Sequence, residues 1–172
     1  MKKILLLFAA VGMLSMTSCT TEEHYDTQDT DTIAEVFVVN GVNFLPDSQG
    51  NMQITIPLNP AIYNSDMVLV YRNSGSNNGK PIWEPVPTNY SLAQGSLQYY
   101  FDFTVDDVML YLYSDFDPAL RPDFTRNQTF RVVIVPGFLS NKGAKTINTK
   151  DYNEVVKAFD IKESDVKEIK LK

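Results

Sequence analysis

The sequence predicts a mainly β fold, an antiparallel β-sandwich with one short C-terminal helix. Segments in which apolar and polar side chains alternate recur along the chain with turn residues between them, a pattern typical of half-buried strands. Only one stretch, near the C-terminus, has helical spacing. The chain is 44% hydrophobic and 12% aromatic, which suits a packed core. Residues 34–172 are expected to form one domain.

The first predicted strands lie in the first half of this domain. Residues 36–39 form a β-branched and aromatic run that is expected to end in a turn at Asn40-Gly41. Residues 52–58 alternate with a period of two, and residues 67–71 form an apolar run short enough for a fully buried strand. The polar, glycine-rich residues 73–79 are predicted to be a hairpin loop too long for a tight turn.

A proline-rich strand and three alternating segments follow. Residues 82–86 lie among Pro81, Pro85 and Pro87, and proline cannot donate to the hydrogen-bond ladder of a sheet. This strand is therefore predicted to be short or to lie at a sheet edge. The alternating segments are residues 97–105, 108–113 and 130–135, with Asp106-Asp107 as the turn between the first two.

The C-terminal part is predicted to hold a helix and a last strand. Thr149 is the expected N-cap, and an apolar stripe at helical spacing follows, formed by Tyr152, Val155, Val156 and Phe159. Residues 166–171 alternate and carry lysines that discourage edge-to-edge pairing. About seven or eight short strands at this spacing indicate an Ig-like sandwich in the loose sense. A partly open barrel is the second arrangement.

The residues before this domain have a different character. Residues 1–18 have the parts of a secretory leader: the basic pair Lys2-Lys3, a short apolar run and small residues before Cys19. The apolar run is shorter than the about 20 residues that span a bilayer. Cys19 is the sole cysteine, at the expected cleavage point, and we expect it to carry acyl chains. Residues 19–33 are expected to be a flexible acidic tether, because they cannot bury enough apolar surface to become ordered.

Charge and cysteine content exclude several classes of protein. Without Lys2 and Lys3 of the leader, the chain has 13 basic against 21 acidic side chains, a net charge of −8. Such a chain repels nucleic acid, so no nucleic-acid partner is expected. If Cys19 is acylated, no disulfide can form, and core burial must supply the stability of the domain.

The domain offers little for catalysis. The single histidine, His24, lies in the tether, so neither a histidine-based triad nor a zinc site is expected in the domain, and no cofactor is expected. The remaining catalytic option is a carboxylate pair for glycan cleavage, drawn from Asp102, Asp106 and Asp107. A turn at Asp106-Asp107 is the favoured interpretation.

One loop holds a weak candidate for a calcium site. Asp115, Asp117 and Asp123 are carboxylates at short spacing, and oxygen ligands suit calcium. The segment lacks the glycine and the closing glutamate of an EF-hand, and Arg121 would partly neutralise the site. Aspartate before proline is common in turns, so a turn is the favoured interpretation.

The aromatic residues offer candidate ligand contacts. Tyr99 and Tyr100 are neighbours on a predicted strand, so they point to opposite faces of its sheet. By the same alternation Tyr100, Tyr111 and Tyr113 can share an outward face, a platform for sugar rings or a protein partner. The favoured alternative is that the C-terminal helix or the second sheet covers this face. Trp83 is expected as an anchor in the core or at an edge, with ligand contact as the lesser alternative.

The leader, the acidic tether and the aromatic-rich strands resemble those of small Bacteroidota surface lipoproteins with Ig-like sandwich domains. The resemblance rests on the predicted strand segments at residues 68–71, 99–103 and 130–134 and on the loose lipobox that ends at Cys19. Glu22-Glu23 resembles the export signal of such lipoproteins. The resemblance implies an outer-membrane lipoprotein exposed at the cell surface and a sandwich architecture, but no reaction. Residues 31–33 resemble the O-glycosylation motif of that phylum, which points to Thr32.

Three functions remain open at this point. The leading expectation is a non-enzymatic cell-envelope module, anchored to membrane lipid through Cys19, that binds a protein or glycan partner. The second is a structural subunit of a surface assembly or pilus that pairs through an exposed edge strand. The third is a carboxylate-based glycan hydrolase.

Overall fold

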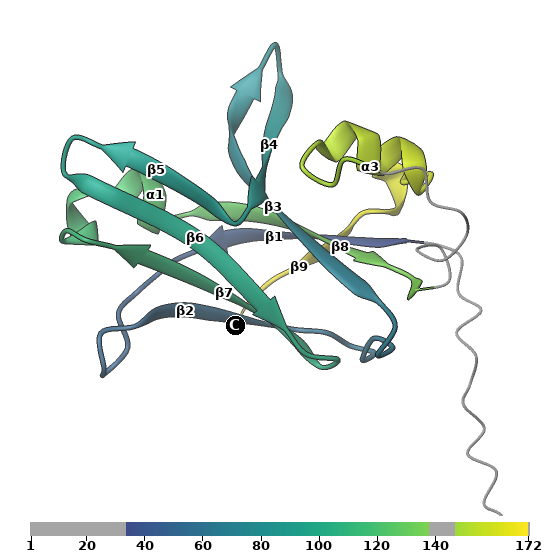
Figure 1. Cartoon of the computed structure of the whole chain (residues 1–172), viewed down its shortest axis with the longest axis horizontal. Coiled ribbons are helices and arrows are strands. Elements are labelled where there is room, and N and C mark those ends of the chain that lie inside the picture. The colour runs from purple at the N-terminus through teal and green to yellow at the C-terminus, as the bar shows by residue number, and fades with distance from the viewer. Residues whose placement is uncertain (1–33, 138–146, 172) are drawn as a thin grey trace, which may run out of the picture.

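The computed structural model describes residues 34–137 and 147–171, which form two β-sheets packed face to face (Figure 1). The five-stranded sheet has the order β4-β3-β8-β1-β9, and the four-stranded sheet has the order β2-β7-β6-β5. The strands are β1 (Glu35–Val42), β2 (Met52–Pro57), β3 (Met67–Asn77), β4 (Lys80–Val86), β5 (Thr88–Leu92), β6 (Gly95–Phe103), β7 (Asp107–Ser114), β8 (Gln128–Val135) and β9 (Lys167–Ile169). The helical segments are η1 (Pro118–Leu120), α1 (Pro122–Thr125), α3 (Tyr152–Ala158) and η2 (Glu163–Asp165).

The predicted antiparallel sandwich with a short C-terminal helix is confirmed. The two sheets keep separate edges, so the alternative of a partly open barrel is wrong. One strand pair departs from the prediction: β9 lies at the edge of the five-stranded sheet and pairs with β1 in parallel. The proline-rich β4 forms the opposite edge of that sheet, as its sequence predicts.

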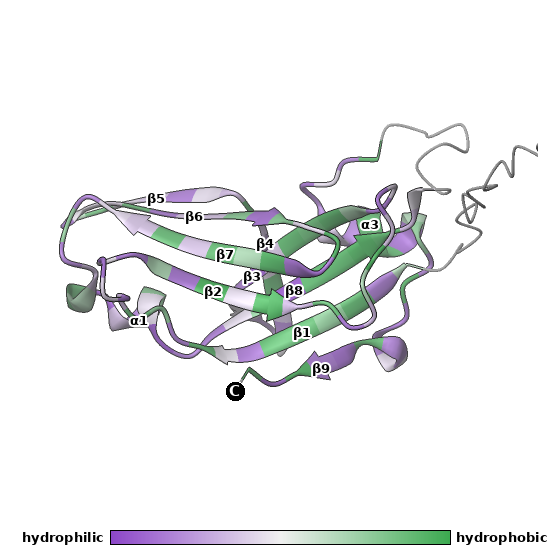
Figure 2. Ribbon diagram, turned by 90° about the horizontal axis from the view of Figure 1, so that it is seen from below, coloured by the Kyte–Doolittle hydropathy of each residue, from purple (hydrophilic) through white to green (hydrophobic). Residues whose placement is uncertain are grey.

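The core lies between the sheets and follows the two-residue period of the strands. On β7, Val108, Leu110 and Leu112 are buried in the core, and the residues between them point to the other side of the sheet. Figure 2 shows the same alternation of hydropathy along the strands of both layers. Burial of these apolar side chains supplies the main driving force for folding.

A second apolar cluster covers the outer face of the five-stranded sheet. Tyr152 and Val155 of α3 are buried against Tyr71 and Val133, and Figure 1 shows α3 beside β4. The helix begins two residues later than the sequence predicts. Its N-cap is Asp151, whose side chain accepts a hydrogen bond from the backbone N–H of Asn153, so the expected cap at Thr149 is wrong.

Two predicted turns are also wrong, and one strand was not predicted. β3 continues through Asn77, and the hairpin to β4 closes through Asn78-Gly79, both with positive φ as a two-residue turn requires. Asn40-Gly41 lies inside β1, where Gly41 has φ of 69° and the pairing with β8 shifts register.

β5 was not predicted because it is short and follows the prolines. The turn at Asp106-Asp107 is confirmed: Thr104 donates hydrogen bonds to Asp107, and its hydroxyl accepts one from the backbone N–H of Asp106.

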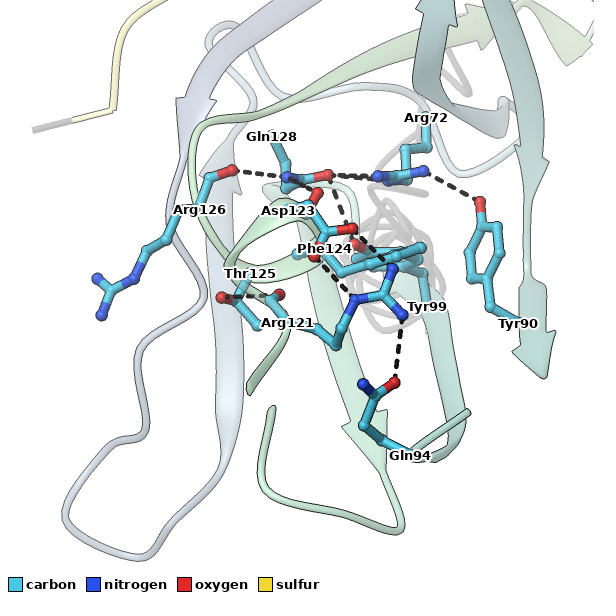
Figure 3. A network of polar contacts seen from close by, with 10 residues as sticks. All are labelled: Arg72, Tyr90, Gln94, Tyr99, Arg121, Asp123, Phe124, Thr125, Arg126 and Gln128. Atoms are coloured by element: carbon cyan, nitrogen blue, oxygen red, sulfur yellow. Dashed lines mark hydrogen bonds and ion pairs between the residues drawn. The ribbon is translucent and has the colours of Figure 1, made fainter. Parts of the chain in front are cut away.

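A buried arginine joins the two sheets at one end of the sandwich. Arg72 of β3 is 7% exposed, and its Nε and one terminal nitrogen donate to Gln128 Oε1 at 2.9 and 2.7 Å (Figure 3). Its other terminal nitrogen donates to the hydroxyl of Tyr90 at 3.2 Å. The guanidinium carbon lies 5.0–5.5 Å from the ring centroids of Tyr90, Tyr99 and Phe124. The charge is thus enclosed by aromatic rings from both the four-stranded sheet and α1.

The same network holds the segment that leads into β8. Gln128 Nε2 donates to the backbone carbonyls of Asp123 and Arg126 at 3.0 and 2.6 Å. The Tyr99 hydroxyl donates to the carbonyl of Phe124, and burial raises the pKa of Tyr99, which keeps this donor protonated. Arg121 forms a two-pronged ion pair with Asp123 at 2.9 and 2.7 Å. The segment 121–127 therefore depends on side chains from both sheets for its position.

Replacing Gln128 by leucine should destabilise the domain, because it leaves a buried guanidinium without its main acceptor. We expect Gln128→Leu to lower the free energy of unfolding by about 3 kcal/mol, and the double variant Arg72→Met/Gln128→Leu to recover most of that loss. Urea unfolding, followed by the fluorescence of Trp83, the sole tryptophan, measures the free energy of unfolding of both variants. A double variant no more stable than Gln128→Leu would contradict this account of the network.

Candidate functional site

Three tyrosines gather on the outward face of the four-stranded sheet. Tyr100 of β6 pairs with Tyr111 of β7, and their rings stack with centroids 4.6 Å apart and planes 9° from parallel. Tyr113 lies two residues further along β7 on the same face, and its exposed fraction of 64% is the largest of the three. Tyr100 is 40% exposed. The predicted shared outward face of these tyrosines is confirmed.

Helix α3 does not cover this face. It packs on the outer side of the five-stranded sheet, and the four-stranded sheet contributes the opposite outer surface of the sandwich (Figure 2). The expectation that the helix or the second sheet hides the tyrosines is therefore wrong. The physical reason is that the outer sides of β1, β3 and β8 are apolar and need a cover, whereas the outer side of the four-stranded sheet is polar.

Amides and hydroxyls surround the tyrosines in register. Gln53 of β2 lies opposite Tyr111, and Gln98 of β6 lies opposite Tyr113. Asn89 of β5 continues that second row beyond Gln98. We call this surface the tyrosine face; by strand register it comprises Gln53, Thr55, Pro57, Asn89, Ser91, Ser96, Gln98, Tyr100, Asp102, Asp107, Met109, Tyr111 and Tyr113. The amide positions were not singled out in the sequence, although the same two-residue alternation identifies them.

A groove of about 650 Å³ opens along one end of this face. The three tyrosines line it, together with the turn before β2 and the segment between β7 and β8. Asp47 orders the turn by accepting hydrogen bonds from Gln49 and Asn51, and the bonds from Asn51 contribute most to lowering the pKa of its carboxyl group. The other wall is the segment held by Arg72 and Gln128 (Figure 3). These loop residues reach the groove only through the folded chain, so the sequence did not reveal them.

The electrostatics of the tyrosine face are simple. Its only charged residues are two carboxylates, Asp102 and Asp107, which lie at the end away from Tyr113. The hydroxyl of Tyr111 donates to Asp102 at 3.0 Å, and the carboxylate of Asp107 accepts from the hydroxyl of Thr104 at 2.8 Å. Desolvation and the bond to Asp102 raise the pKa of Tyr111. This phenol is therefore a neutral donor at physiological pH.

Trp83 lies elsewhere and does not join the tyrosines. It belongs to β4, and its ring packs 6.0 Å from that of Tyr152 and 4.3 Å from the guanidinium carbon of Arg131. Arg131 is 5% exposed and forms an ion pair of 2.7 Å with Glu163. Trp83 is thus half-buried beneath α3, and the prediction of an edge anchor fits its position on the outermost strand.

The three aspartates of the calcium candidate each have another partner. Asp115 accepts from the backbone N–H of Ser96 at 2.7 Å, and Asp117 accepts from that of Ala119 as the N-cap of η1. Asp123 pairs with Arg121, whose hydrogen bonds lower the pKa of that carboxyl group. No group of three or more potential metal ligands occurs among the described residues. The arrangement therefore matches the turn interpretation.

The groove also lacks the carboxylate pair of a glycan hydrolase. Among its described lining residues Asp117 is the only acid, and Arg126 the only base. Cys19, His24 and Thr32 lie outside the described residues. The expected lipidation of Cys19 and glycosylation of Thr32 therefore stay predictions.

Comparison with protein-family models, with curated proteins and with solved structures finds no match for this chain. Among the described helices, none has the length and apolar character needed to cross a membrane. The geometry of the site is therefore the basis for a functional assignment.

The hydrogen bond between Tyr111 and Asp102 can be tested by titration. Asp102→Asn removes the negative charge that disfavours the phenolate, so the pKa of Tyr111 should fall toward the ordinary value of 10.0. Ultraviolet difference titration of the variant against the wild type measures this shift, and Tyr111→Phe identifies the signal. Asp106→Asn, which changes a nearby exposed carboxylate, is the matched control. An unchanged titration in Asp102→Asn would show that the bond is not formed in solution.

Proposed function

We propose that this protein is a lipid-anchored, non-enzymatic module of the cell envelope that binds a protein or glycan partner through its tyrosine face. The observation that carries the proposal is the stacked pair Tyr100–Tyr111 with the exposed Tyr113 in one groove. Covering an exposed aromatic ring removes apolar surface from water and lowers the free energy of the system. A cluster of such rings on one exposed face therefore indicates a binding surface.

The tyrosines suit binding for two physical reasons. Each ring offers a large contact area and has only two side-chain torsions, so little conformational entropy is lost when it is covered. The stacked pair is further restrained, because each ring blocks one face of the other and Asp102 holds the hydroxyl of Tyr111. A surface that is already ordered binds at a lower entropic cost.

The anchor is proposed from the sequence. Residues 1–18 carry the features of a leader, Cys19 follows at the expected cleavage point, and residues 19–33 form an acidic tether. More than one acyl chain on Cys19 would give a stable attachment, since a single chain binds a membrane only marginally. The proposed location is the outer membrane, with the domain exposed at the cell surface.

The two other functions have no specific observation in their favour. A pilus-like subunit needs a long open edge strand, but β4 carries Pro81 and Pro85, and β9 has only three residues. The edges of the four-stranded sheet, β2 and β5, have six and five residues, and β2 ends in Pro57.

A carboxylate-based hydrolase needs two carboxylates in one cleft, and the described lining of the groove holds one. A second, smaller pocket is lined by Glu35 and Asp66, but Glu35 pairs with Lys167 at 2.8 Å, and Asp66 accepts hydrogen bonds from the backbone of Tyr63 and Gly137.

The anchor is tested by labelling cells with a radioactive fatty acid. The wild-type chain should take up the label and partition with membranes, and Cys19→Ala should lose both properties. Protease shaving of intact cells then distinguishes a domain exposed at the surface from one facing the periplasm. Label retained in Cys19→Ala would disprove acylation at that residue.

The binding face is tested with the full chain purified in detergent. The probes are purified polysaccharides, neutral and charged, and envelope proteins separated on a blot. At least one probe should bind the wild type, and Tyr113→Ala should weaken its Kd by at least about tenfold, or about 1.4 kcal/mol. Tyr63→Ala is the matched control, because Tyr63 is 50% exposed but lies outside the groove. Equal binding by wild type and Tyr113→Ala for every probe would refute the proposal.

A further inference from the structure

We infer that the ligand of the tyrosine face is an uncharged polysaccharide chain. This inference rests on the proposed function and specifies the chemical class of its partner. Its first ground is the sign of the charges on this face, which include two carboxylates and no lysine or arginine. Protein surfaces usually intersperse charges of both signs, so a face without basic side chains offers no complement to an anionic ligand.

The two carboxylates do not provide a site for a cation. Asp102 accepts the hydroxyl of Tyr111, and Asp107 accepts the hydroxyl of Thr104 within the turn between β6 and β7. Asp102 lies beside the stacked pair, and Asp107 lies at the end of the sheet away from Tyr113. Both would repel an anionic polymer that ran along the sheet, and Arg126 is the one basic side chain among the described residues that line the groove. Charge therefore argues against polyanions, and the face offers a polycation only carboxylates that already accept hydrogen bonds.

The remaining side chains match the chemistry of a sugar chain. A sugar ring has apolar C–H faces, which can stack on Tyr100, Tyr111 or Tyr113, and hydroxyl edges, which need both donors and acceptors. The amides of Gln53, Gln98 and Asn89 each provide a donor and an acceptor. By strand register they lie in the same two rows as the tyrosines, so one ligand can use ring and amide contacts together.

The dimensions favour a chain over a single sugar. Neighbouring strands lie about 4.8 Å apart, so the row from β5 to β7 through Asn89, Gln98 and Tyr113 spans about 10 Å, and the four strands span about 14 Å. The groove has a volume of about 650 Å³ and opens along the face, so a ligand bound in it can continue across the strands. A ligand that extends past the edges of the sheet can still occupy every contact.

A protein partner fits these observations less well. Stable protein interfaces have a buried apolar centre rich in anchoring side chains, with polar groups at the rim. On the tyrosine face Gln98 lies beside the tyrosines, Gln53 and Asn89 flank them on the two edge strands, and Met109 is the only aliphatic side chain other than Pro57. Amide groups need partners when they are covered, and a ligand dense in hydroxyls supplies them.

Affinity electrophoresis and calorimetry with the full chain in detergent test this inference. The probes are three neutral polymers (an α-glucan, a β-glucan and a mannan), an anionic one (polygalacturonate) and a cationic one (chitosan). At least one neutral polymer should bind, with a Kd that changes less than about twofold between about 50 and about 500 mM NaCl, since no ion pair is involved. Tyr113→Ala should weaken this binding at least about tenfold.

A charge placed on the face sharpens the test. Gln98→Glu keeps the size of the side chain but leaves a carboxylate to be covered by the ligand, so it should weaken neutral-polymer binding at least about tenfold. Asn77→Asp makes the same chemical change at an exposed position on the β3–β4 hairpin and should leave binding unchanged. Equal effects of the two variants would overturn the inference.

The outcomes separate this inference from the proposed function. Binding of a neutral polymer that depends on Tyr113 and Gln98 supports both. Binding only of a charged polymer or of an envelope protein, lost in Tyr113→Ala, overturns the inference and leaves the proposed function standing. If no probe binds in a manner that depends on Tyr113, both fail.

Discussion

The buried guanidinium of Arg72 is the constraint around which one end of the sandwich is organised. An arginine side chain stays charged in proteins, so it can be buried only where acceptors and ring faces replace its water. Gln128 Oε1 and the hydroxyl of Tyr90 accept its hydrogen bonds, and the rings of Tyr90, Tyr99 and Phe124 cover its faces. These partners come from both sheets and from α1, so the sheets must meet in one register for the charge to be satisfied.

This constraint extends to the groove beside the tyrosine face. Gln128 uses its oxygen for Arg72 and its nitrogen for the carbonyls of Asp123 and Arg126, so one side chain connects the core to the groove wall. Tyr99 faces inward and contacts Phe124, while its neighbour Tyr100 faces outward into the groove. The order of the binding surface and the satisfaction of the buried charge thus depend on the same strands.

Local sequence patterns predicted most of the strands and the outward tyrosines, because side chains on a strand alternate with a period of two. They identified Tyr100, Tyr111 and Tyr113 but could not show that α3 packs on the opposite sheet, which depends on the apolar outer faces of three strands distant in sequence. The parallel pairing of β9 with β1 joins strands from the two ends of the domain, so local patterns could not predict it either. Arg72 and Gln128 were missed because nothing local reveals that two polar residues will meet inside the core.

The direction of β1 decides which end of the sandwich lies nearest the proposed lipid anchor. The strand starts at Glu35 opposite Ile134 and ends at Val42 opposite Gln128, so the chain enters the sandwich at the pole remote from the groove. With the proposed lipid upstream of Glu35, the groove would lie at the end of the sandwich away from the point of attachment. Eight residues of extended chain, about 25 Å, together with the tether, would set the reach of the groove beyond the bilayer. Such a position would leave the groove accessible to a polymer too large to enter the space next to the bilayer.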